Sequence, residues 1–496
     1  MDAVFFAKVA AFVLYLGMMI FIGLRSASKN NNSADFFLGG RKVGPWVTAL
    51  SAEASDSSAW LLMGLPGLCY LGGIQESIWT AIGLILGTYL SWLFVAKPLR
   101  KCSITFGDSI TIPEFLSNRF NDKSHILSVV SVIFIVLFFT IYTASGFVAC
   151  AKLFNSVFGL NYYAGLAIGL VVILCYTVTG GYTAVCTTDF VQGTLIFIAF
   201  VVSTVIAVFA IGGTGNAVNV FQNFKEVVGT EMQPFNGMGI VSALAWGLGY
   251  FGMPHIIVRF MGIRSNSEVK KARRIGIVWM IVSYIGAILI GTLGIVYLKK
   301  FGITLDSVSA ETVFSATMQN MYPAFIAGIF LCAILAASMS TADSQLLAAS
   351  SAVSQDIFKG LIKKDAEEKD VMTVSRVTVF LIALVALLLS LNEKSSIFSL
   401  VSFAWSGFGG TFGPLVLLAL YWKRTTAPGA IAGLICGGVT DVVWHYIPGT
   451  VNPIFGVYEI LPAFIVCLVV TVIVSLLTKP DAEIQAKFDA YKKLED

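Results

Sequence analysis

The chain has 496 residues, of which 57% are hydrophobic and only 12% are charged, and its formal net charge is +4. Soluble domains carry about 25% charged residues, so this composition excludes an ordinary soluble protein. The apolar runs are about 20 residues or longer, the length that a helix needs to cross a membrane, whereas a membrane β-barrel would show short alternating segments. We therefore expect an all-α polytopic membrane protein.

Hydropathy predicts thirteen membrane-spanning helices. In chain order they lie near residues 4–24, 44–70, 74–96, 126–151, 161–178, 189–212, 237–260, 274–298, 322–357, 374–392, 396–421, 427–447 and 457–478. The first run lacks the basic leader and small-residue cleavage site of a signal peptide, so we expect it to be retained. The connections are too short to form separate soluble domains.

The basic residues give the expected orientation. With the N-terminus outside, the cytoplasmic side holds all but six of the 32 Lys and Arg residues, including Arg25, Lys29, Arg41 and Arg259. The six on the outside are Lys8, Lys152, Lys225, Lys299, Lys300 and Lys394. The positive-inside rule therefore predicts an external N-terminus and a cytoplasmic C-terminus.

Two predicted spans look interrupted. The second contains "SAEASDSSAWLLMGLPG" (Ser51–Gly67), with the acids Glu53 and Asp56 at mid-membrane depth, where charged residues are costly and usually functional. The seventh contains "AWGLGYFGMPHIIVRF", which places three glycines before Pro254. Close packing or a plain kink is the alternative explanation for glycine and proline in a membrane helix.

The two interrupted spans lie five spans apart and so cross the membrane in opposite directions, as in an inverted repeat that opens with a broken helix. The predicted organisation is a first helix and cytoplasmic loop over 1–43, a first repeat over 44–212, a second repeat over 237–421, two peripheral helices over 422–478 and a cytoplasmic tail over 479–496.

The ninth span presents a small, oxygen-bearing face. Ala337, Ser340, Thr341 and Ser344 follow the i, i+3, i+4, i+7 spacing of one helix side. A break in the second span around Ala54–Ser57 would free backbone carbonyls toward it. Such oxygen ligands suit a hard cation, which we expect to be Na⁺; a packing seam of small residues is the alternative.

Three further acids have open roles. Asp189 and Asp343 lie in the cytoplasmic half of their spans, and with Ser344 they form a second candidate cation site or an ion release path. A solvated cytoplasmic mouth, or a helix N-cap at Asp189, is the alternative. Glu53 remains unexplained: it would pair with a cation, line an inner vestibule, or bind a proton or a second Na⁺.

Four stretches resemble the sodium/solute symporter family, and within it the chain most closely resembles bacterial carriers of proline. These stretches are "DFFLGGRKVGPWVTALSAEASDSSAWLLMGLPG" (Asp35–Gly67), "WGLGYFGMPHIIVRFMGI" (Trp246–Ile263), "AASMSTADSQLL" (Ala336–Leu347) and "FAWSGFGGTFGP" (Phe403–Pro414). The likeness extends over about residues 5–480. It implies a leucine-transporter-like core of five-plus-five inverted helices, in a bacterial inner membrane.

The resemblance also implies the site. It implies Na⁺ ligation by the carbonyls of Ala54, Ser57 and Ala337 and by the hydroxyls of Ser340 and Thr341. It implies substrate contacts or coupling roles for Asp56, Ser58, Trp60, Trp246, Tyr250 and Pro254. Proline is a zwitterion with an apolar ring, and this ring would pack on Trp246, Tyr250 or Phe251. Met253 stands where a glutamine is expected in such carriers, and this departure admits another amino acid or a carboxylate as the solute.

These features predict a Na⁺-coupled symporter for a small zwitterionic solute, L-proline first, with Li⁺ as an expected substitute ion. We expect no enzymatic activity, no nucleic-acid binding and no obligate protein partner. The three histidines, His125, His255 and His445, are scattered and share no metal-ligand spacing. A membrane sensor or enzyme is the remote alternative.

Overall fold

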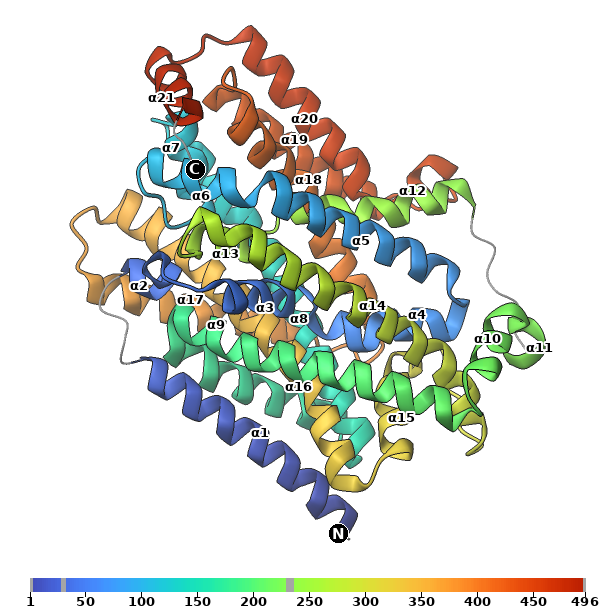
Figure 1. The fold of residues 1–496 in the computed structure, drawn as a ribbon. Coiled ribbons are helices and arrows are strands. Elements are labelled where there is room, and N and C mark those ends of the chain that lie inside the picture. Colours follow the sequence, from blue (N-terminus) through green and yellow to red (C-terminus); the bar gives the residue numbers. More distant parts are fainter. Residues whose placement is uncertain (1–2, 28–32, 229–235, 494–496) are drawn as a thin grey trace.

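A computed structural model describes residues 3–27, 33–228 and 236–493. The predicted loop residue Lys29 and the last three residues of the predicted tail lie outside these ranges. Within them the chain is helical throughout and contains one isolated β-bridge, between Val43 and Ile263. Figure 1 shows the long helices packed side by side, with the N-terminus and the C-terminal helix at opposite ends of the bundle.

The helices that form the bundle are, in chain order, α1 (Ala3–Ala27), α3 (Pro45–Asp56), α4 (Leu65–Gly72), α5 (Gln75–Phe94), α8 (Ile126–Phe158), α9 (Tyr162–Ala210), α12 (Gly237–Ala245), α13 (Pro254–Gly262), α14 (Val269–Lys299), α16 (Ala324–Ser351), α17 (Glu368–Leu389), α18 (Ile397–Tyr421), α19 (Ala427–Tyr446) and α20 (Ile460–Leu477). Shorter helices lie at the ends of the bundle: α2 (Ser33–Leu38), α6 (Ala96–Thr105), α7 (Ile112–Phe120), α10 (Thr214–Gln222), α11 (Phe224–Val228), α15 (Val313–Met321) and α21 (Ala482–Lys493).

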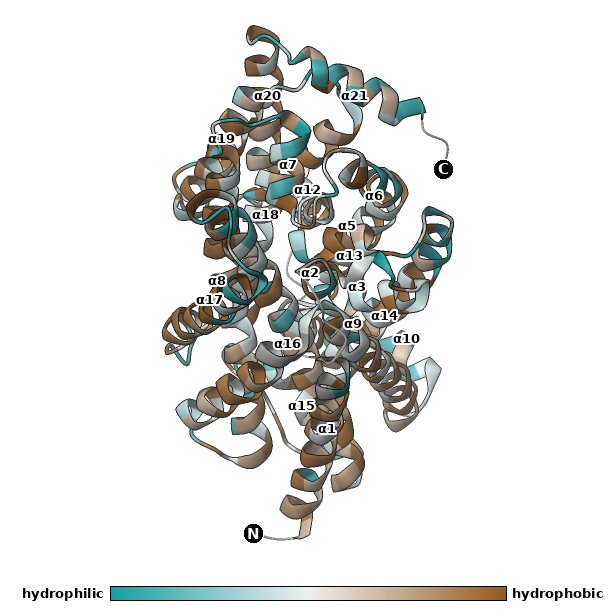
Figure 2. Ribbon diagram, turned by 90° about the vertical axis from the view of Figure 1, so that its left-hand side faces the viewer, coloured by the Kyte–Doolittle hydropathy of each residue, from teal (hydrophilic) through white to brown (hydrophobic). Residues whose placement is uncertain are grey.

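The structure confirms a polytopic all-α membrane protein. Ten helices in the described part of the chain are long and apolar enough to cross a membrane, and the bent pair Gly237–Phe251 and Pro254–Gly262 makes eleven. The two remaining predicted spans coincide with shorter apolar helices, Trp60–Gly72 and Tyr162–Cys175, so the count of thirteen is not met by length alone. Figure 2 shows apolar residues along the long helices and hydrophilic residues concentrated in α21 and the loops.

The fifth and sixth spans, predicted to end near 178 and to begin near 189, meet at Gly181 within α9 (Tyr162–Ala210), where φ is 64° and ψ is 179°. Glycine accepts this backbone conformation without a steric penalty. The sixth span therefore begins about two turns earlier than predicted. Asp189 therefore lies about two turns inside a helix and is not an N-cap.

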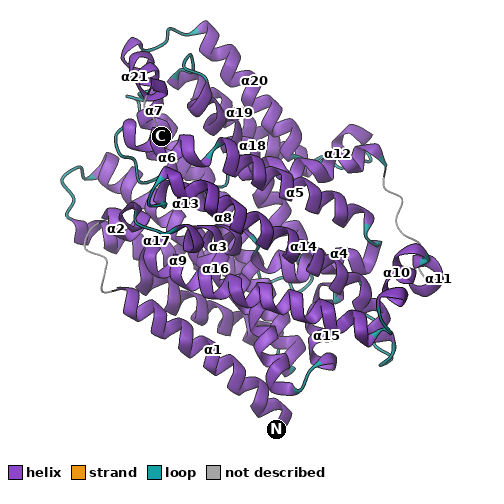
Figure 3. Cartoon of the chain, viewed as in Figure 1, coloured by secondary structure: helices purple, strands orange, loops and turns teal. Residues whose placement is uncertain are grey.

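Both predicted interruptions are present (Figure 3). The helix α3 ends at Asp56 and is followed by a π-helical turn, η2 (Trp60–Gly64), before α4 begins. In the other span, α12 tightens into the 3₁₀ segment η3 (Trp246–Phe251), and Met253 is extended (φ −69°, ψ 106°) before α13 begins at Pro254. Proline is favoured at the first turn of a helix because its missing N–H would have no partner there.

The cytoplasmic ends predicted for these two broken spans are joined by backbone. The N–H of Val43 donates to Gly262 O at 3.3 Å, and the N–H of Arg264 donates to Val43 O at 2.9 Å. The Arg41 guanidinium reinforces this junction by donating to Met261 O at 2.9 Å and by pairing with Asp108 at 3.0 Å. The start of α3 and the end of α13 are therefore held as one unit.

Candidate functional site

The site begins at the carbonyls that α3 leaves free. Because the helix ends at Asp56, its last carbonyls lack partners within the helix. Three neighbouring helices supply donors instead: the Ser340 hydroxyl to Ala54 O at 2.8 Å, His255 Nε2 to Ser55 O at 3.2 Å, and the Tyr142 hydroxyl to Asp56 O at 3.3 Å. The break is thus wrapped by α16, α13 and α8.

The predicted Na⁺ residues meet at this break. Ser340 Oγ lies 2.8 Å from Ala54 O and 3.2 Å from Ala337 O. The buried hydroxyls of Thr341 and Ser57 have no hydrogen-bond partner among the described residues. The Ser57 carbonyl instead accepts from the N–H of Leu61 at 3.3 Å. Buried oxygens that receive no hydrogen bond are suited to a hard cation such as Na⁺. The oxygen ligands present here therefore fit this ion.

The residues of the second candidate cation site also come together, around an arginine. Asp189 Oδ2 accepts from Ser51 at 2.6 Å and from Ser55 at 3.1 Å, and it pairs with Arg259 Nη2 at 3.4 Å. The same Nη2 donates to Ser344 Oγ at 2.5 Å. We call these residues, with Asp343, the inner cluster.

The inner cluster is buried and retains unpaired acceptors. Asp343 accepts weakly from Ser344 at 3.4 Å, and its other oxygen, like Asp189 Oδ1, has no partner within the described ranges. Both carboxylates and the guanidinium are at most 1% exposed. Two carboxyl groups are therefore buried beside one guanidinium, and each keeps an oxygen that a bound cation could take.

The predicted substrate residues form an aromatic and acidic surface beside the break, which we call the wall. The Tyr250 hydroxyl donates to the Asp56 carboxylate, and the Ser58 hydroxyl accepts from the N–H of Trp60 at 3.1 Å. The ring of Trp60 packs against that of Trp246, with centroids 5.3 Å apart. Phe251, Met253 and Pro254 follow on the same span, and all are buried.

A family model described as the sodium:solute symporter family matches residues 36–437. The "Sodium/proline symporter" of Staphylococcus aureus (strain JH9) is 43% identical over 483 residues, covering 96% of this chain and 93% of that protein. The chain belongs to the sodium:solute symporter family. Transport, rather than enzymatic catalysis, is therefore its activity, and Na⁺ is the coupling ion.

Solved structures show the same fold. A Na⁺-coupled sialic acid symporter in a substrate-bound, outward-open state superposes with a TM-score of 0.77 at 20% identity, covering 96% of this symporter and 98% of that chain. A nucleobase-cation-symport-1 family transporter in a closed conformation superposes with a TM-score of 0.55 at 13% identity, covering 92% and 97%.

Several residues of the symporter's site escape sequence reasoning. The charge pattern counts Arg259 among the cytoplasmic basic residues but does not predict its burial in the inner cluster, where it is 1% exposed. Its signal was an arginine four residues after His255 within an apolar run, which puts both on one helix face. Three other residues carry no local signal: Tyr142, Phe398, whose ring lies 5.5 Å from Trp246, and Trp405, which donates to Trp246 O at 2.7 Å.

The structure shows which residues surround Glu53. Its side chain is 2% exposed and accepts a hydrogen bond from the indole N–H of Trp92 at 3.1 Å. It lies against Gly276 of α14, where an added Cβ would be 2.5 Å from Glu53 Oε1. Among the described residues no cation pairs with it. Glu53 therefore links α3 to α5 and α14 and is not in the inner cluster.

Glu53→Gln is expected to retain most uptake, because the amide oxygen still accepts from Trp92. Gly276→Ala is expected to lower the free energy of unfolding by about 1–3 kcal/mol, the usual cost of overpacking, and so to lower the unfolding temperature. The double variant Glu53→Ala/Gly276→Ala should regain part of that loss, since the shorter side chain removes the clash. Thermal unfolding of the purified variants checks this; equal stability of Gly276→Ala and the parent chain would contradict the contact.

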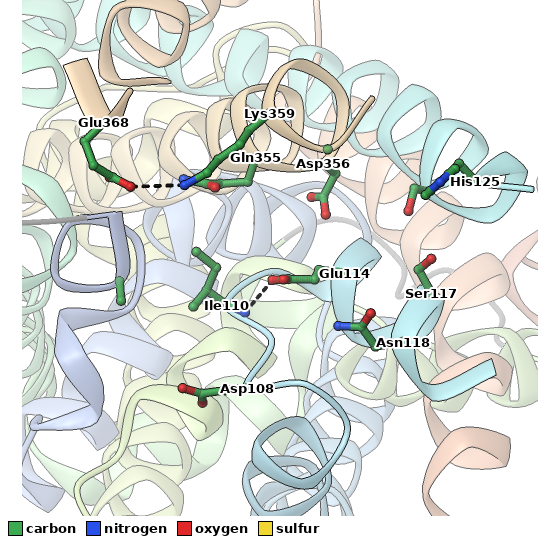
Figure 4. Close-up of a pocket in the computed structure, with 13 residues that line it drawn as sticks. Asp108, Ile110, Glu114, Ser117, Asn118, His125, Gln355, Asp356, Lys359 and Glu368 are labelled. Atoms are coloured by element: carbon green, nitrogen blue, oxygen red, sulfur yellow. Dashed lines mark hydrogen bonds and ion pairs between the residues drawn. The ribbon is translucent and has the colours of Figure 1, made fainter. Parts of the chain in front are cut away.

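Two cavities lie beyond the inner cluster. A small one of about 20 Å³, room for about one water, is lined by Pro254, Arg259 and Ser344 and also by Ile110. Ile110 also lines a larger cavity of about 550 Å³, shown in Figure 4.

Acids and one lysine project into the larger cavity. Asp356 and Glu114 point into it from opposite walls, and Lys359 pairs with Glu368 at 3.1 Å (Figure 4). Burial raises the pKa of the Glu114 carboxyl, against two backbone hydrogen bonds that lower it. None of the residues predicted for the ion or the substrate lines this cavity.

Proposed function

We propose that this symporter couples inward Na⁺ flow to the uptake of L-proline by alternating access. The observation that supports it is the contact between Ser340 Oγ and the freed Ala54 carbonyl on α3, with the buried, unpartnered Thr341 hydroxyl next along α16 and an aromatic wall beside the break. The 43% identity to a sodium/proline symporter across 96% of the chain favours proline as the solute.

The proposal includes a specific topology. We place thirteen spans, with α3–α4 and the first part of α9 counted as spans, and two inverted repeats over 44–212 and 237–421. The remaining parts are 1–43, 422–478 and 479–496. The charge distribution supports an external N-terminus and a cytoplasmic C-terminus, in a bacterial inner membrane. The orientation is tested by replacing Lys8 or Lys487 with cysteine and measuring from which side of the membrane each introduced thiol is labelled.

The wall has the three features that a proline zwitterion requires. Backbone N–H groups at Ser58–Trp60, at the start of a half-helix, would meet the carboxylate. The faces of Trp246, Tyr250 and Phe251 would pack the pyrrolidine ring. The ammonium group would lie over an aromatic face or meet a freed carbonyl. Met253, fully buried, adds an apolar surface, and this feature keeps another amino acid or a carboxylate as the second candidate.

Coupling follows from the shared break. A Na⁺ bound between Ala54 O and the Ser340 and Thr341 hydroxyls would order α3 against α16, and Asp56 two residues later orients Tyr250 in the wall. Such coupling between sites is typically about 1–3 kcal/mol.

One Na⁺ per zwitterion moves one charge, worth about 2.3 kcal/mol at 100 mV, and a tenfold gradient adds about 1.4 kcal/mol. One ion therefore suffices for several-hundred-fold accumulation.

The inner cluster is proposed as a second cation position on the release route. It lies between the first Na⁺ site, through the Ser55 and Ser344 hydroxyls 2.8 Å apart, and the small cavity lined by Arg259 and Ser344. The acid-lined larger cavity follows and would attract a departing cation. Asp343→Asn replaces a carboxyl group, one oxygen of which has no partner in the described structure, by an amide, so we expect it to reduce Na⁺-induced thermal stabilisation; an unchanged Na⁺ effect would remove this second position.

The deciding experiment is uptake in proteoliposomes with Na⁺, Li⁺ and H⁺ gradients applied separately. We expect proline uptake that requires Na⁺, is partly supported by Li⁺ and is accelerated by a negative interior. Competition by a panel of amino acids and carboxylates separates proline from the second candidate. Uptake that ignores Na⁺ and follows the proton gradient would overturn the proposal.

A further inference from the structure

A membrane-facing groove lies between α3, α9 and α14, and none of the residues predicted for the ion or the substrate lines it. These three helices are neighbours in Figure 1. The groove has a volume of about 490 Å³, and apart from Thr194 and Arg274 its lining is apolar, with Trp46, Leu50, Phe197 and Val278 among the lining residues. Trp46 is 53% exposed and Val278 is 58% exposed, so the groove opens toward the surrounding lipid.

One end of the groove is strongly basic. Arg274 belongs to the sequence "VKKARR" that begins α14, where Lys270, Lys271 and Arg273 are also basic and no acid occupies the first turn. The Arg273 guanidinium lies over the ring of Tyr89, 5.2 Å from its centroid. In the parts of the chain that the structure describes, Arg274, Lys270 and Lys271 form no salt bridge.

The placement of these charges is not explained by the helix itself. A helix N-terminus carries a partial positive charge and is stabilised by acids, so a basic run there is unfavourable for the helix. Glu268, the nearest acid before it, is engaged by Arg264. The positive-inside rule accounts for basic residues on this side, and because Arg274 has no ion-pair partner in the described structure, its charge at the end of the groove is available to an anion from outside the chain.

We propose that this groove binds one anionic phospholipid. Its phosphate meets Arg274, and the first part of an acyl chain lies between Leu50, Phe197 and Val278. Arg274 and Val278 are four residues apart, about 6 Å along the helix, which matches the depth from a phosphate to the first methylene groups. Trp46 also lines the groove, and tryptophan is enriched at the membrane interface, the depth of the lipid phosphate and first methylene groups. With the proposed orientation this is the cytoplasmic leaflet, whose anionic lipids attract basic segments.

The groove also adjoins the first Na⁺ site. Leu50 lies one turn before Ala54 on the same side of α3, and a Cβ at Gly193 of α9 would be 3.2 Å from Ala54 Cβ. The indole N–H of Trp279, which lines the groove, donates to Gly193 O at 2.8 Å. An occupied groove therefore braces the helix that supplies the freed carbonyls, and we expect the lipid to change the Na⁺ dependence of uptake.

The test is retention of phosphatidylglycerol, measured by native mass spectrometry after equilibration in vesicles of phosphatidylglycerol and phosphatidylcholine. The parent chain and Lys364→Gln, a control that removes an exposed basic residue outside the groove and outside this basic run, should retain one phosphatidylglycerol. Arg274→Gln should retain about fivefold less, from the loss of one basic contact. Val278→Trp fills the groove without changing charge and should show a similar loss.

Two outcomes would overturn the proposal. Equal retention of phosphatidylglycerol and phosphatidylcholine would show that the site does not select an anion. Retention lost in Arg274→Gln but kept in Val278→Trp would show attraction at the surface without insertion into the groove. Because this measurement uses no substrate, it does not depend on proline being the solute.

Discussion

Uptake by the double variant Ser340→Ala/Thr341→Ala is expected to require at least tenfold more Na⁺ than uptake by the parent chain. Ser340 Oγ lies 2.8 Å from Ala54 O, and Thr341 Oγ1 is buried without a partner in the described structure. A polar contact to a charged group contributes about 1.5–3 kcal/mol, so each lost hydroxyl should weaken Na⁺ binding by about 10–100-fold. The measurement is the Na⁺ concentration that gives half-maximal uptake.

Ser338→Ala is the matched control for this double variant. Ser338 lies on the same helix and is equally buried, but its hydroxyl donates to Ile334 O at 2.9 Å, within the helix. Its Na⁺ dependence should equal that of the parent chain. If the double variant shows the same Na⁺ dependence as Ser338→Ala, the cation is not held by these two hydroxyls.

The second large effect is expected at Arg259. Arg259→Gln leaves the Asp189 carboxylate buried without its positive partner, and breaking a buried ion pair in this way typically costs about 3–5 kcal/mol. We expect low expression, a marked loss of thermal stability and near-complete loss of uptake. The double variant Arg259→Gln/Asp189→Asn should recover much of the stability, because both charges of the pair are removed and neither is left buried alone.

Thermal unfolding of the two single variants and the double variant gives the coupling between Arg259 and Asp189 directly. Uptake of the double variant separates stability from transport: a stable protein that does not transport would show that the charges act in the cycle and not only in folding. Additive losses of stability in the double variant would contradict the pairing seen at 3.4 Å.

Features that depend on neighbours along the chain were predictable from the sequence. Long apolar runs and a bias of basic loops indicate a polytopic helical protein, because a helix satisfies its backbone groups within one segment. The breaks in α3–α4 and α12–α13 follow from local acids, serines, glycines and proline. The oxygen face of Ala337, Ser340 and Thr341 follows from helix periodicity. These are local properties, and the structure places them together as expected.

The packing partners of each helix face were not predictable from the sequence. Periodicity placed Glu53 on one side of α3 but gave no indication that Trp92 and Gly276 receive it. Charge counting placed Arg259 on the cytoplasmic side but gave no indication of its partners Asp189 and Ser344, which come from helices far away in the sequence. A buried charge is tolerated only when distant residues compensate it. The sequence by itself therefore determined the helices, the breaks and the oxygen-bearing face of α16, whereas only the tertiary structure decided which buried charges share a site.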